Sequence, residues 1–600
     1  MTIAPNINTL WARCFVDELA RCGLTDVCIA PGSRSTPLVE AFAAHPQIRD
    51  HSLIDERSAA FFGLGLAIAT GRPVALVCTS GTAAANFTPA ICEASHSAIP
   101  LLVLTADRPA HLHDCGASQA MDQGRLYGSF ARFFHHVDHP EPTAEKLRYI
   151  RALACQAFHE SLGPAPGPVH LNFPFRKPLE SSAVPPDHRD YVDPDLARTA
   201  PLAIDGRPDG APFRATSRGT PTLSADDARR LFDLLVKAER PLILAGADPR
   251  GTRYAAPLHE LAAALSIPVI AEPTSGLRGL LEDRPNLFTT GDILFQSAFY
   301  DELGAPDLIL RTGRPPLNWN AARRVRSWPQ ALQISLSSAP TVLDPDHLLS
   351  WAIQTDELAA IEALLDLLGH DDRPPGDPMW LKHHRVAEDA ALASLATEFQ
   401  SSDRPLTAPD AWNTLATALP DGAGLFVSSS MPIRDLDTFL CGSSAALEIF
   451  ANRGLNGIDG TIATGLGVAA ARGEPTVIVV GDVAFRHDLG SLLLASELGI
   501  DATLLVLDNG GGAIFDYLPI AETSPETFRK HFTTGDHQAF AHPPVDPTTW
   551  QEPTTGEELR QALEDSLHTP GLQVLRVRTS AELDRRIRDE IRAAAAGGTP

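Results

Sequence analysis

Apolar residues in this chain gather in short continuous runs that alternate with segments of helical periodicity. The run Thr476–Val480 is β-branched throughout, which predicts a strand buried on both faces of a parallel sheet. Helical spacing over Leu489–Leu498 predicts a helix, and a second apolar run, Ala502–Leu507, predicts the next strand. This order of strand, helix and strand is typical of α/β folds with parallel sheets.

Polar residues that carry oxygen ligands follow both of these strands. The first strand leads into Gly481-Asp482, and the second leads into Asp508-Asn509 and a run of three glycines. Open α/β sheets bind ligands at the carboxyl ends of their strands. A carboxylate, an amide oxygen and glycine-exposed backbone suit a hard cation such as Mg2+, which keeps part of its shell for phosphate oxygens. Taken alone, Asp482 and Asn509 are as compatible with ordinary strand ends.

The chain contains a second copy of this unit, 402 positions earlier. Residues Gly63–Val77 (GLGLAIATGRPVALV) and Gly465–Val479 (GLGVAAARGEPTVIV) are identical at eight of fifteen positions. In both copies a helix of small residues leads through Gly-x-Pro into a buried strand. A repeat at this long spacing predicts two homologous α/β domains with a further segment between them. The earlier copy has Thr79-Ser80 where the later copy has Gly481-Asp482, so the metal-type ligands belong to one copy.

The stretch between the two copies predicts a domain of its own. Helices are predicted at Ala225–Ala238 and Tyr254–Ala264, and strands at Pro241–Gly246, Pro268–Ala271 and Asp307–Arg311. This pattern indicates a small Rossmann-like domain without a phosphate fingerprint. Residues 184–224 and 371–378 are rich in proline and aspartate and indicate a linker and a break. At the amino terminus, a helix at Asn8–Arg21 and a strand at Asp26–Ala30 are predicted.

Composition narrows the class of protein. With 600 residues the chain is too long for one core, and its formal net charge of −25 argues against a nucleic-acid partner. The eight cysteines lack CxxC spacing, which is typical of reduced, buried thiols rather than of a disulfide framework. The sequence has no signal-peptide pattern and no run of eighteen apolar residues. We therefore expect a soluble, cytoplasmic protein that acts on small molecules and has neither a nucleic-acid nor a membrane partner.

Gly481-Asp482, followed by Asn509, resembles the diphosphate and metal motif of thiamine-diphosphate enzymes, and the long-range repeat strengthens this resemblance. The resemblance implies three doubly wound α/β domains with mostly parallel sheets, of which the first and third are homologous and the middle one is Rossmann-like. The implied boundaries are a pyrimidine-binding domain at 1–185, a linker at 186–222, a middle domain at 223–372 and a diphosphate- and metal-binding domain at 373–600.

Five stretches of the amino-terminal part resemble one branch of that superfamily, the 2-succinyl-5-enolpyruvyl-6-hydroxy-3-cyclohexene-1-carboxylate synthases of menaquinone biosynthesis. They are PGSRSTPL, DERSAAFFGLGLA, TSGTAAAN, TADRP and GASQAMDQ. The resemblance implies a transferase that decarboxylates 2-oxoglutarate and adds the succinyl unit to isochorismate in a 1,4 sense. Glu56 matches the catalytic glutamate that bonds N1′ of the cofactor's aminopyrimidine, and burial is expected to raise the pKa of its carboxyl group.

Two sets of polar residues match the substrate contacts of that branch. Ser33, Arg34, Arg108 and Gln119 match the residues that line the isochorismate pocket. Ser430 and Arg434 match the pair that holds the distal carboxylate of 2-oxoglutarate, and Arg453 is expected to be a further anion contact. Arginine suits such dicarboxylate substrates because its planar guanidinium pairs with carboxylates through two hydrogen bonds.

The resemblance also implies a cofactor shell, a metal and an assembly. Ile458 matches the apolar residue that props the cofactor in its bent conformation, although an ordinary core isoleucine is as compatible with the sequence. The full set of expected contacts to thiamine diphosphate is Glu56, Pro31, Thr79, Ser430, Met431, Asn452, Ile458, Gly481, Asp482, Val483, Asn509, Ile514 and Phe515. Mg2+, or Mn2+, is expected on Asp482, Asn509 and Gly511. Because the catalytic glutamate and the metal ligands lie in different domain copies, we expect a homodimer or a dimer of dimers.

Other readings stay open at this point. A carboligase or decarboxylase for pyruvate-like substrates needs fewer arginines in its pocket. A nucleotide-binding oxidoreductase has only the weak motif at Gly465, Gly467 and Ala470. A non-catalytic relic is disfavoured by the retained Glu56, Asp482 and Asn509. The family's substrate-contacting lysine is absent from Leu317–Asn320, where Arg314 and Arg323 are the candidate replacements. Residues 516–552 are interpreted as a mobile lid.

Overall fold

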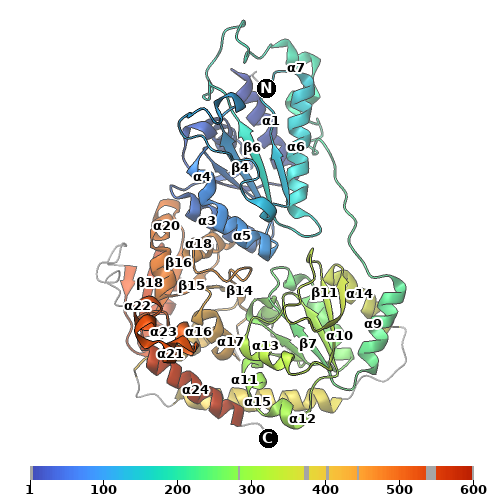
Figure 1. Ribbon diagram of the computed structural model, residues 1–600, viewed down its shortest axis with the longest axis vertical. Coiled ribbons are helices and arrows are strands. Elements are labelled where there is room, and N and C mark those ends of the chain that lie inside the picture. The colour runs from blue at the N-terminus through green and yellow to red at the C-terminus, as the bar shows by residue number, and fades with distance from the viewer. Residues whose placement is uncertain are drawn as a thin grey trace. The chain divides into compact units, whose positions relative to one another are not determined.

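We describe a computed structural model of the chain, which covers residues 4–280, 284–369, 378–400, 405–441, 445–534 and 549–597 (Figure 1). The chain divides into two compact units. The first comprises residues 1–219 with 463–471, and the second comprises residues 220–462 with 472–600. Within the described residues the strands form three six-stranded sheets, and every strand pair is parallel. The predicted α/β class with parallel sheets is confirmed.

The first sheet has the strand order β2-β1-β3-β4-β6-β5. Helices α1, α2 and α6 contribute to the core on one face, and α3 and α5 contact the strands on the other. The strands are β1 Asp26–Ile29, β2 Arg49–Ser52, β3 Val74–Cys78, β4 Leu101–Asp107, β5 Phe133–His136 and β6 Pro168–Pro174. The helices are α1 Ile7–Cys22, α2 Thr36–Ala43, α3 Glu56–Thr70, α4 Thr82–Asn86, α5 Thr88–Ser97, α6 Ala144–Leu162, α7 Asp195–Thr199 and α8 Pro201–Asp205.

The middle sheet has the order β12-β11-β10-β7-β8-β9, which is the 3-2-1-4-5-6 order of Rossmann folds. One face packs on α9, α10 and α14, and the other on α11, α12, α13 and the start of α15. The strands are β7 Pro241–Ala245, β8 Val269–Ala271, β9 Leu287–Phe288, β10 Leu308–Thr312, β11 Leu332–Ser337 and β12 Leu349–Gln354. The helices are α9 Ala225–Lys237, α10 Ala255–Ala264, α11 Gly291–Gln296, α12 Phe299–Leu303, α13 Trp319–Arg326, α14 Glu357–Leu368 and α15 Pro378–Gln400.

The third sheet, β14-β13-β15-β16-β18-β17, repeats the strand order of the first, as the long-range repeat predicts. Its core includes α16, α17, α23 and α24 on one face. The strands are β13 Gly424–Val427, β14 Glu448–Phe450, β15 Thr476–Gly481, β16 Ala502–Asp508, β17 Trp550–Gln551 and β18 Leu572–Arg578. The helices are α16 Ala408–Ala418, α17 Met431–Phe439, α18 Thr461–Arg472, α19 Asp482–His487, α20 Leu492–Leu498, α21 Ile520–Thr523, α22 Pro525–His531, α23 Gly556–Leu567 and α24 Ala581–Gly597.

Two segments differ from their sequence-based description. The expected linker at 186–222 contains α7 and α8. Ala203 and Ile204 of α8 are buried because they pack on helices of the first sheet. Their carbonyl oxygens accept hydrogen bonds from the buried Arg151. The stretch interpreted as a lid, 516–552, holds α21 and α22 in its described part, and residues 535–548 lie outside the described residues. No helix in the ranges that the structure describes is both long and apolar enough to cross a bilayer.

Candidate functional site

Three neighbouring strands of the third sheet bring the predicted ligands to one edge. Strands β13, β15 and β16 lie side by side, with Val427 opposite Val479 and Gly481 opposite Leu507. Ser430 follows the first of these strands, Asp482 the second and Asn509 the third. The carboxyl ends of parallel strands share one edge of the sheet, which is where open α/β sheets bind ligands.

Asp482 begins α19 and is only 2% exposed. Burial, and then the nearby Asp508 carboxylate, raise the pKa of Asp482 to about 7. Hydrogen bonds from the backbone N–H groups of Val483, at 2.9 Å, and Gly511 partly offset this rise. Two buried carboxylates at one place are costly, and a divalent cation between protein and ligand would relieve that cost.

The second carboxylate is already neutralised by an arginine. Asp508 accepts a hydrogen bond from Arg576 Nε of β18 at 2.9 Å, and a second from Nη2 of the same guanidinium. Arg576 Nη1 also reaches Glu552 at 3.0 Å. The sequence indicated Asp508 only as the end of a strand, because its partner lies on a strand that is distant in sequence. Asp482 therefore remains as the carboxylate of this pair that suits a metal.

The Asn509 side chain supplies a further oxygen. Its Oδ1 atom is buried and has no hydrogen-bond partner among the described residues. Gly511 adopts φ of +148°, and a Cβ atom there would lie 1.9 Å from the Thr533 carbonyl oxygen, so the loop needs glycine at this position. A carboxylate, an orphaned amide oxygen and open backbone fit a hard cation such as Mg2+.

Ser430 and Arg434 occupy the turn into α17. Ser430 has φ of +75°, a strained value for a residue with a side chain, and its carbonyl accepts a hydrogen bond of 2.6 Å from Arg434 Nη1. Burial and the nearby Arg453 guanidinium lower the pKa of Arg434 to about 10. Within the described residues, the buried Arg434 Nε makes no hydrogen bond. Two guanidinium groups this close indicate a site built for an anion.

The middle sheet contributes to the same surroundings, since it belongs to the same unit. The Trp319 ring, at the start of α13, lies under the Arg434 guanidinium with 4.4 Å from Cζ to the ring centroid. Arg314 Nη2 donates to the Gly454 carbonyl at 3.2 Å and so lies beside the loop that carries Arg453. Arg323, the other candidate for the missing lysine, is exposed on α13. Sequence reasoning missed Trp319, because nothing in its local pattern links it to α17.

The expected cofactor contacts of this unit divide into buried and partly exposed residues. Met431 and Asn452 are buried, and the Asn452 carbonyl accepts a 3.3 Å hydrogen bond from Ser429 Oγ. Ile458 is partly exposed and is not among the buried residues described for the core of the third sheet. The remaining predicted contacts, Gly481, Val483, Ile514 and Phe515, are partly exposed as well.

In the first unit, Glu56 begins α3 at the carboxyl end of its sheet. Asp55 caps this helix by accepting a 3.0 Å hydrogen bond from the Ser58 backbone N–H. Glu56 is partly exposed rather than buried, and its carboxylate makes no hydrogen bond with the residues described. It lies close enough to Cys78, the last residue of β3, to help raise the pKa of that thiol, whose main cause is burial. In the single chain, Glu56 is thus not buried as the resemblance implies.

Arg34 and Arg108 lie near each other at the same edge of the first sheet. Arg34 is 8% exposed; its Nη1 donates to the Phe175 carbonyl at 2.8 Å, while its buried Nε has no partner in the described part of the chain. Burial and then Arg108 lower the pKa of Arg34. Arg108 Nη1 donates to Ser80 Oγ. As for Arg434 beside Arg453, burial and a neighbouring guanidinium thus lower the pKa of a buried arginine here.

Amide side chains complete this cluster. Gln119 Nε2 donates to the Ser80 carbonyl at 3.1 Å, so Gln119 and Arg108 both bond Ser80. The fully buried Gln123 accepts from the Gly81 N–H at 2.8 Å and donates to Asn172 at 2.8 Å. Asn172 also donates to Asp107 at 2.7 Å. Gln123 therefore shapes the Ser80–Gly81 turn, a role that the sequence did not reveal.

The remaining predicted residues of this unit surround the cluster. Thr79 is buried, and its Oγ1 accepts a 3.2 Å hydrogen bond from the Arg34 N–H. Pro31 and Ser33 are exposed on the loop that precedes α2. A Cβ atom on Gly32 would lie 2.2 Å from Thr79 Cβ, so glycine allows this loop to approach the end of β3.

Comparison with known proteins assigns the chain to a family. Residues 11–126 match the family described as thiamine pyrophosphate enzyme, N-terminal TPP binding domain. A relative from Haloarcula marismortui is 40% identical over 98% of both chains, one from Geobacillus kaustophilus is 39% identical over 95% of both, and one from Roseiflexus castenholzii is 40% identical over 90% of both. Each is named 2-succinyl-5-enolpyruvyl-6-hydroxy-3-cyclohexene-1-carboxylate synthase. The chain belongs to this synthase family.

Membership of the synthase family confirms the resemblance read from the five amino-terminal stretches. The matched region, 11–126, contains Arg34, Glu56, Thr79, Arg108 and Gln119. The roles of individual residues were assigned from the resemblance and stay predictions.

Proposed function

We propose that the protein is a thiamine-diphosphate-dependent transferase that decarboxylates 2-oxoglutarate and adds the succinyl unit to isochorismate. The products are CO2 and 2-succinyl-5-enolpyruvyl-6-hydroxy-3-cyclohexene-1-carboxylate, an intermediate of menaquinone biosynthesis. The observation that carries this proposal is the presence of two arginine pairs, Arg34 with Arg108 and Arg434 with Arg453, in which burial and then the neighbouring guanidinium lower the pKa of one member. Such pairs are suited to two dicarboxylate substrates.

Residues of the third sheet would hold the diphosphate and its metal. Asp482, Asn509 and the backbone of Gly511 form the donor set for Mg2+ or Mn2+, and the unpartnered Asn509 Oδ1 supports it. When bound, thiamine diphosphate supplies the nucleophilic carbon and the electron sink with which a 2-oxo acid loses CO2. Glu56 would hold a proton against the pyrimidine ring, and its freedom from other hydrogen bonds among the described residues leaves its carboxylate available. Ile458, which is partly exposed, would press on the cofactor.

Each arginine pair would bind one substrate. Arg434 and Arg453, with Ser430, would take the distal carboxylate of 2-oxoglutarate, and Trp319 would hold the Arg434 guanidinium in place. Of the two candidates for the missing lysine, we favour Arg314, because it contacts the loop that carries Arg453. In the first unit, Arg34 and Arg108, with Ser33 and Gln119, would bind isochorismate.

We further propose a domain division at 1–185, 186–222, 223–372 and 373–600, and an assembly of two copies or a dimer of dimers. The partial exposure of Glu56 supports an assembly, because a buried carboxyl group is better suited to proton transfer at neutral pH. No cysteine among the described residues forms a disulfide bond, which agrees with a cytoplasmic location.

The test is a product assay on purified apoprotein. Thiamine diphosphate, Mg2+ and isochorismate are added singly and together to 2-oxoglutarate, and CO2 and the ring product are measured. We expect CO2 release only with cofactor and metal, and ring product only when isochorismate is also present. Release of CO2 from pyruvate but not from 2-oxoglutarate would favour a carboligase or decarboxylase of the same superfamily and would overturn the proposal. Arg434→Ala serves as the matched variant, in which the KM for 2-oxoglutarate should rise.

A further inference from the structure

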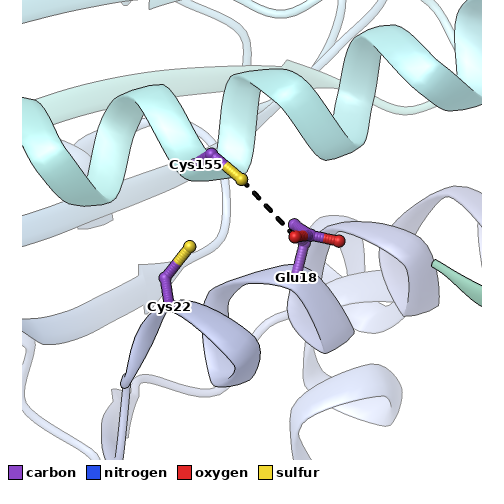
Figure 2. Close-up of side chains that lie close together, drawn as sticks. All are labelled: Glu18, Cys22 and Cys155. Carbon is purple, nitrogen blue, oxygen red and sulfur yellow. Dashed lines mark hydrogen bonds between the residues drawn. The ribbon is translucent and has the colours of Figure 1, made fainter. Parts of the chain in front are cut away.

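Apart from the residues assigned to the proposed reaction, helices α1 and α6 bring three potential metal ligands together. Glu18 and Cys22 lie four residues apart on one face of α1, and Cys155 faces them from α6 (Figure 2). One ligand atom from each residue lies within 4.8 Å of the other two. Glu18 and Cys155 are buried, whereas Cys22, the last residue of α1, is partly exposed. Nothing in the proposed reaction uses this cluster.

The separations suit a tetrahedral metal. Cys155 Sγ donates to Glu18 Oε1 across 3.4 Å. With Zn–S near 2.3 Å and Zn–O near 2.0 Å, a tetrahedral zinc ion places its sulfur and oxygen ligands roughly 3.5 Å apart and two sulfur ligands roughly 3.8 Å apart. The first spacing is therefore already present. The ligand atoms of the cluster lie within 4.8 Å of one another, which exceeds the ideal sulfur–sulfur spacing by about 1 Å at most. Cys22 is partly exposed at the end of its helix and can move by this amount.

The surroundings hold the ligands in place. The Phe213 backbone N–H donates to Glu18 Oε1, and Arg151 Nη1 donates to Oε2 at 2.7 Å. The Arg214 backbone N–H donates to Cys155 Sγ at 3.4 Å. Hydrogen bonds of this kind orient the ligands of metal sites and tune their basicity.

We propose that Glu18, Cys22 and Cys155 bind one soft divalent cation, of the Zn2+ type, with a fourth position open to water beside Cys22. Thiolates select such cations over Mg2+, so the site is separate from the one proposed on Asp482 and Asn509. Two thiolates and one carboxylate would give the bound ion a net charge of minus one, which the Arg151 guanidinium balances. Binding requires both thiols to lose their protons to solvent.

The test uses the full-length protein, kept reduced by a non-thiol reductant and held in excess Mg2+ to occupy carboxylate sites. Cd2+ is the probe, because it replaces Zn2+ in thiolate sites and gives an ultraviolet charge-transfer absorption only when it binds sulfur. We expect one Cd2+ per chain, displaced by Zn2+. In Cys22→Ser and in Cys155→Ser the absorption should fall by at least half.

Cys115→Ser is the matched control, because Cys115 is exposed and lies outside the cluster. Its absorption should equal that of the unaltered protein. Full absorption in both cluster variants, or its loss in Cys115→Ser, would overturn the proposal. A serine at the buried Cys155 risks unfolding the helix pair, so proton release is also measured on the unaltered protein by calorimetry in two buffers. We expect roughly one to two protons released per Zn2+, and none released would equally overturn it.

Discussion

Replacing Trp319 by leucine tests whether the middle of the chain tunes the proposed 2-oxo acid site. The Trp319 ring lies 4.4 Å from the Arg434 Cζ atom, and Tyr517 packs edge-on against the same ring at 6.3 Å. Leucine keeps an apolar side chain but removes the ring quadrupole that attracts the guanidinium. Arg434 keeps its hydrogen bond to the Ser430 carbonyl and loses the ring contact that helps to fix its orientation.

The size of the effect follows from the exposure of the pair. A cation–π contact contributes about 0.5–1 kcal/mol at exposed sites and about 2 kcal/mol when desolvated. Trp319 is 42% exposed and Arg434 is partly buried, so a loss of about 1 kcal/mol is reasonable. That free energy corresponds to about a fivefold change in binding. Because Arg434 would bind the substrate in the ground state and the transition state alike, the KM for 2-oxoglutarate should rise about fivefold while kcat changes by less than about twofold.

The assay is steady-state CO2 release with 2-oxoglutarate varied at saturating cofactor, metal and isochorismate. Trp351→Leu is the matched control, because Arg230 Cζ lies 4.5 Å from the Trp351 ring centroid, an equivalent contact on β12. The control should lose similar stability and leave KM unchanged. An unchanged KM in Trp319→Leu, or an equal increase in both variants, would refute the reasoning.

Three other changes have expected outcomes. Glu56→Gln should keep the fold and lower kcat by roughly 10²–10⁴-fold. Asp55→Asn is the control, because asparagine still caps α3, and it should keep most activity. Full activity in Glu56→Gln would contradict the assignment of Glu56. Arg588→Met should lower the free energy of unfolding, measured by urea titration, by about 3–5 kcal/mol. The reason is that Arg588 bonds both Asp435 oxygens at 2.6 Å and that each of the two side chains is 1% exposed. A loss below about 1 kcal/mol would show that the pair is dispensable. Burial lowers the pKa of His384 from 6.5 to about 4, so its neutral form stabilises the fold above pH 6.5, and about 3 kcal/mol should be lost as the pH falls towards 4. His384→Gln should flatten that part of the stability profile, and an unchanged slope would contradict this account.

The sequence predicted the elements that are buried on both faces. Thr476–Val480 is β-branched throughout, a pattern that predicts a central strand of a parallel sheet. The run forms β15, which pairs with β13 on one side and β16 on the other. The middle sheet was only partly predicted, because β9 has two residues and because β11 and β12 mix apolar with polar residues and contain several partly exposed positions. Short edge strands gain their stability from neighbours rather than from local pattern.

Residues of the candidate site were predicted where a local motif carries them, as for Asp482 and Asn509. Those that depend on distant partners were not. Trp319 gains its relevance from α17, and Asp508 from Arg576 on β18, so neither contact has a local signal. The expected linker differs from its prediction in another way. Phe213 and Arg214 lie in it, and their backbone N–H groups bond Glu18 and Cys155 of the cysteine cluster.

The two homologous sheets preserve one buried acid and differ in its partner. Asp107 ends β4 and Asp508 ends β16, and the partners come from equivalent places, since Thr105 pairs with Asn172 and Val506 pairs with Arg576. The two sheets thus share the acid, which meets an amide in the first sheet and a guanidinium in the third. In the third sheet the guanidinium offsets the charge of Asp508 at the edge where Asp482 adds a further carboxyl group. A divalent cation bound at the proposed site would turn this edge of the sheet positive, the sign that an anionic ligand requires.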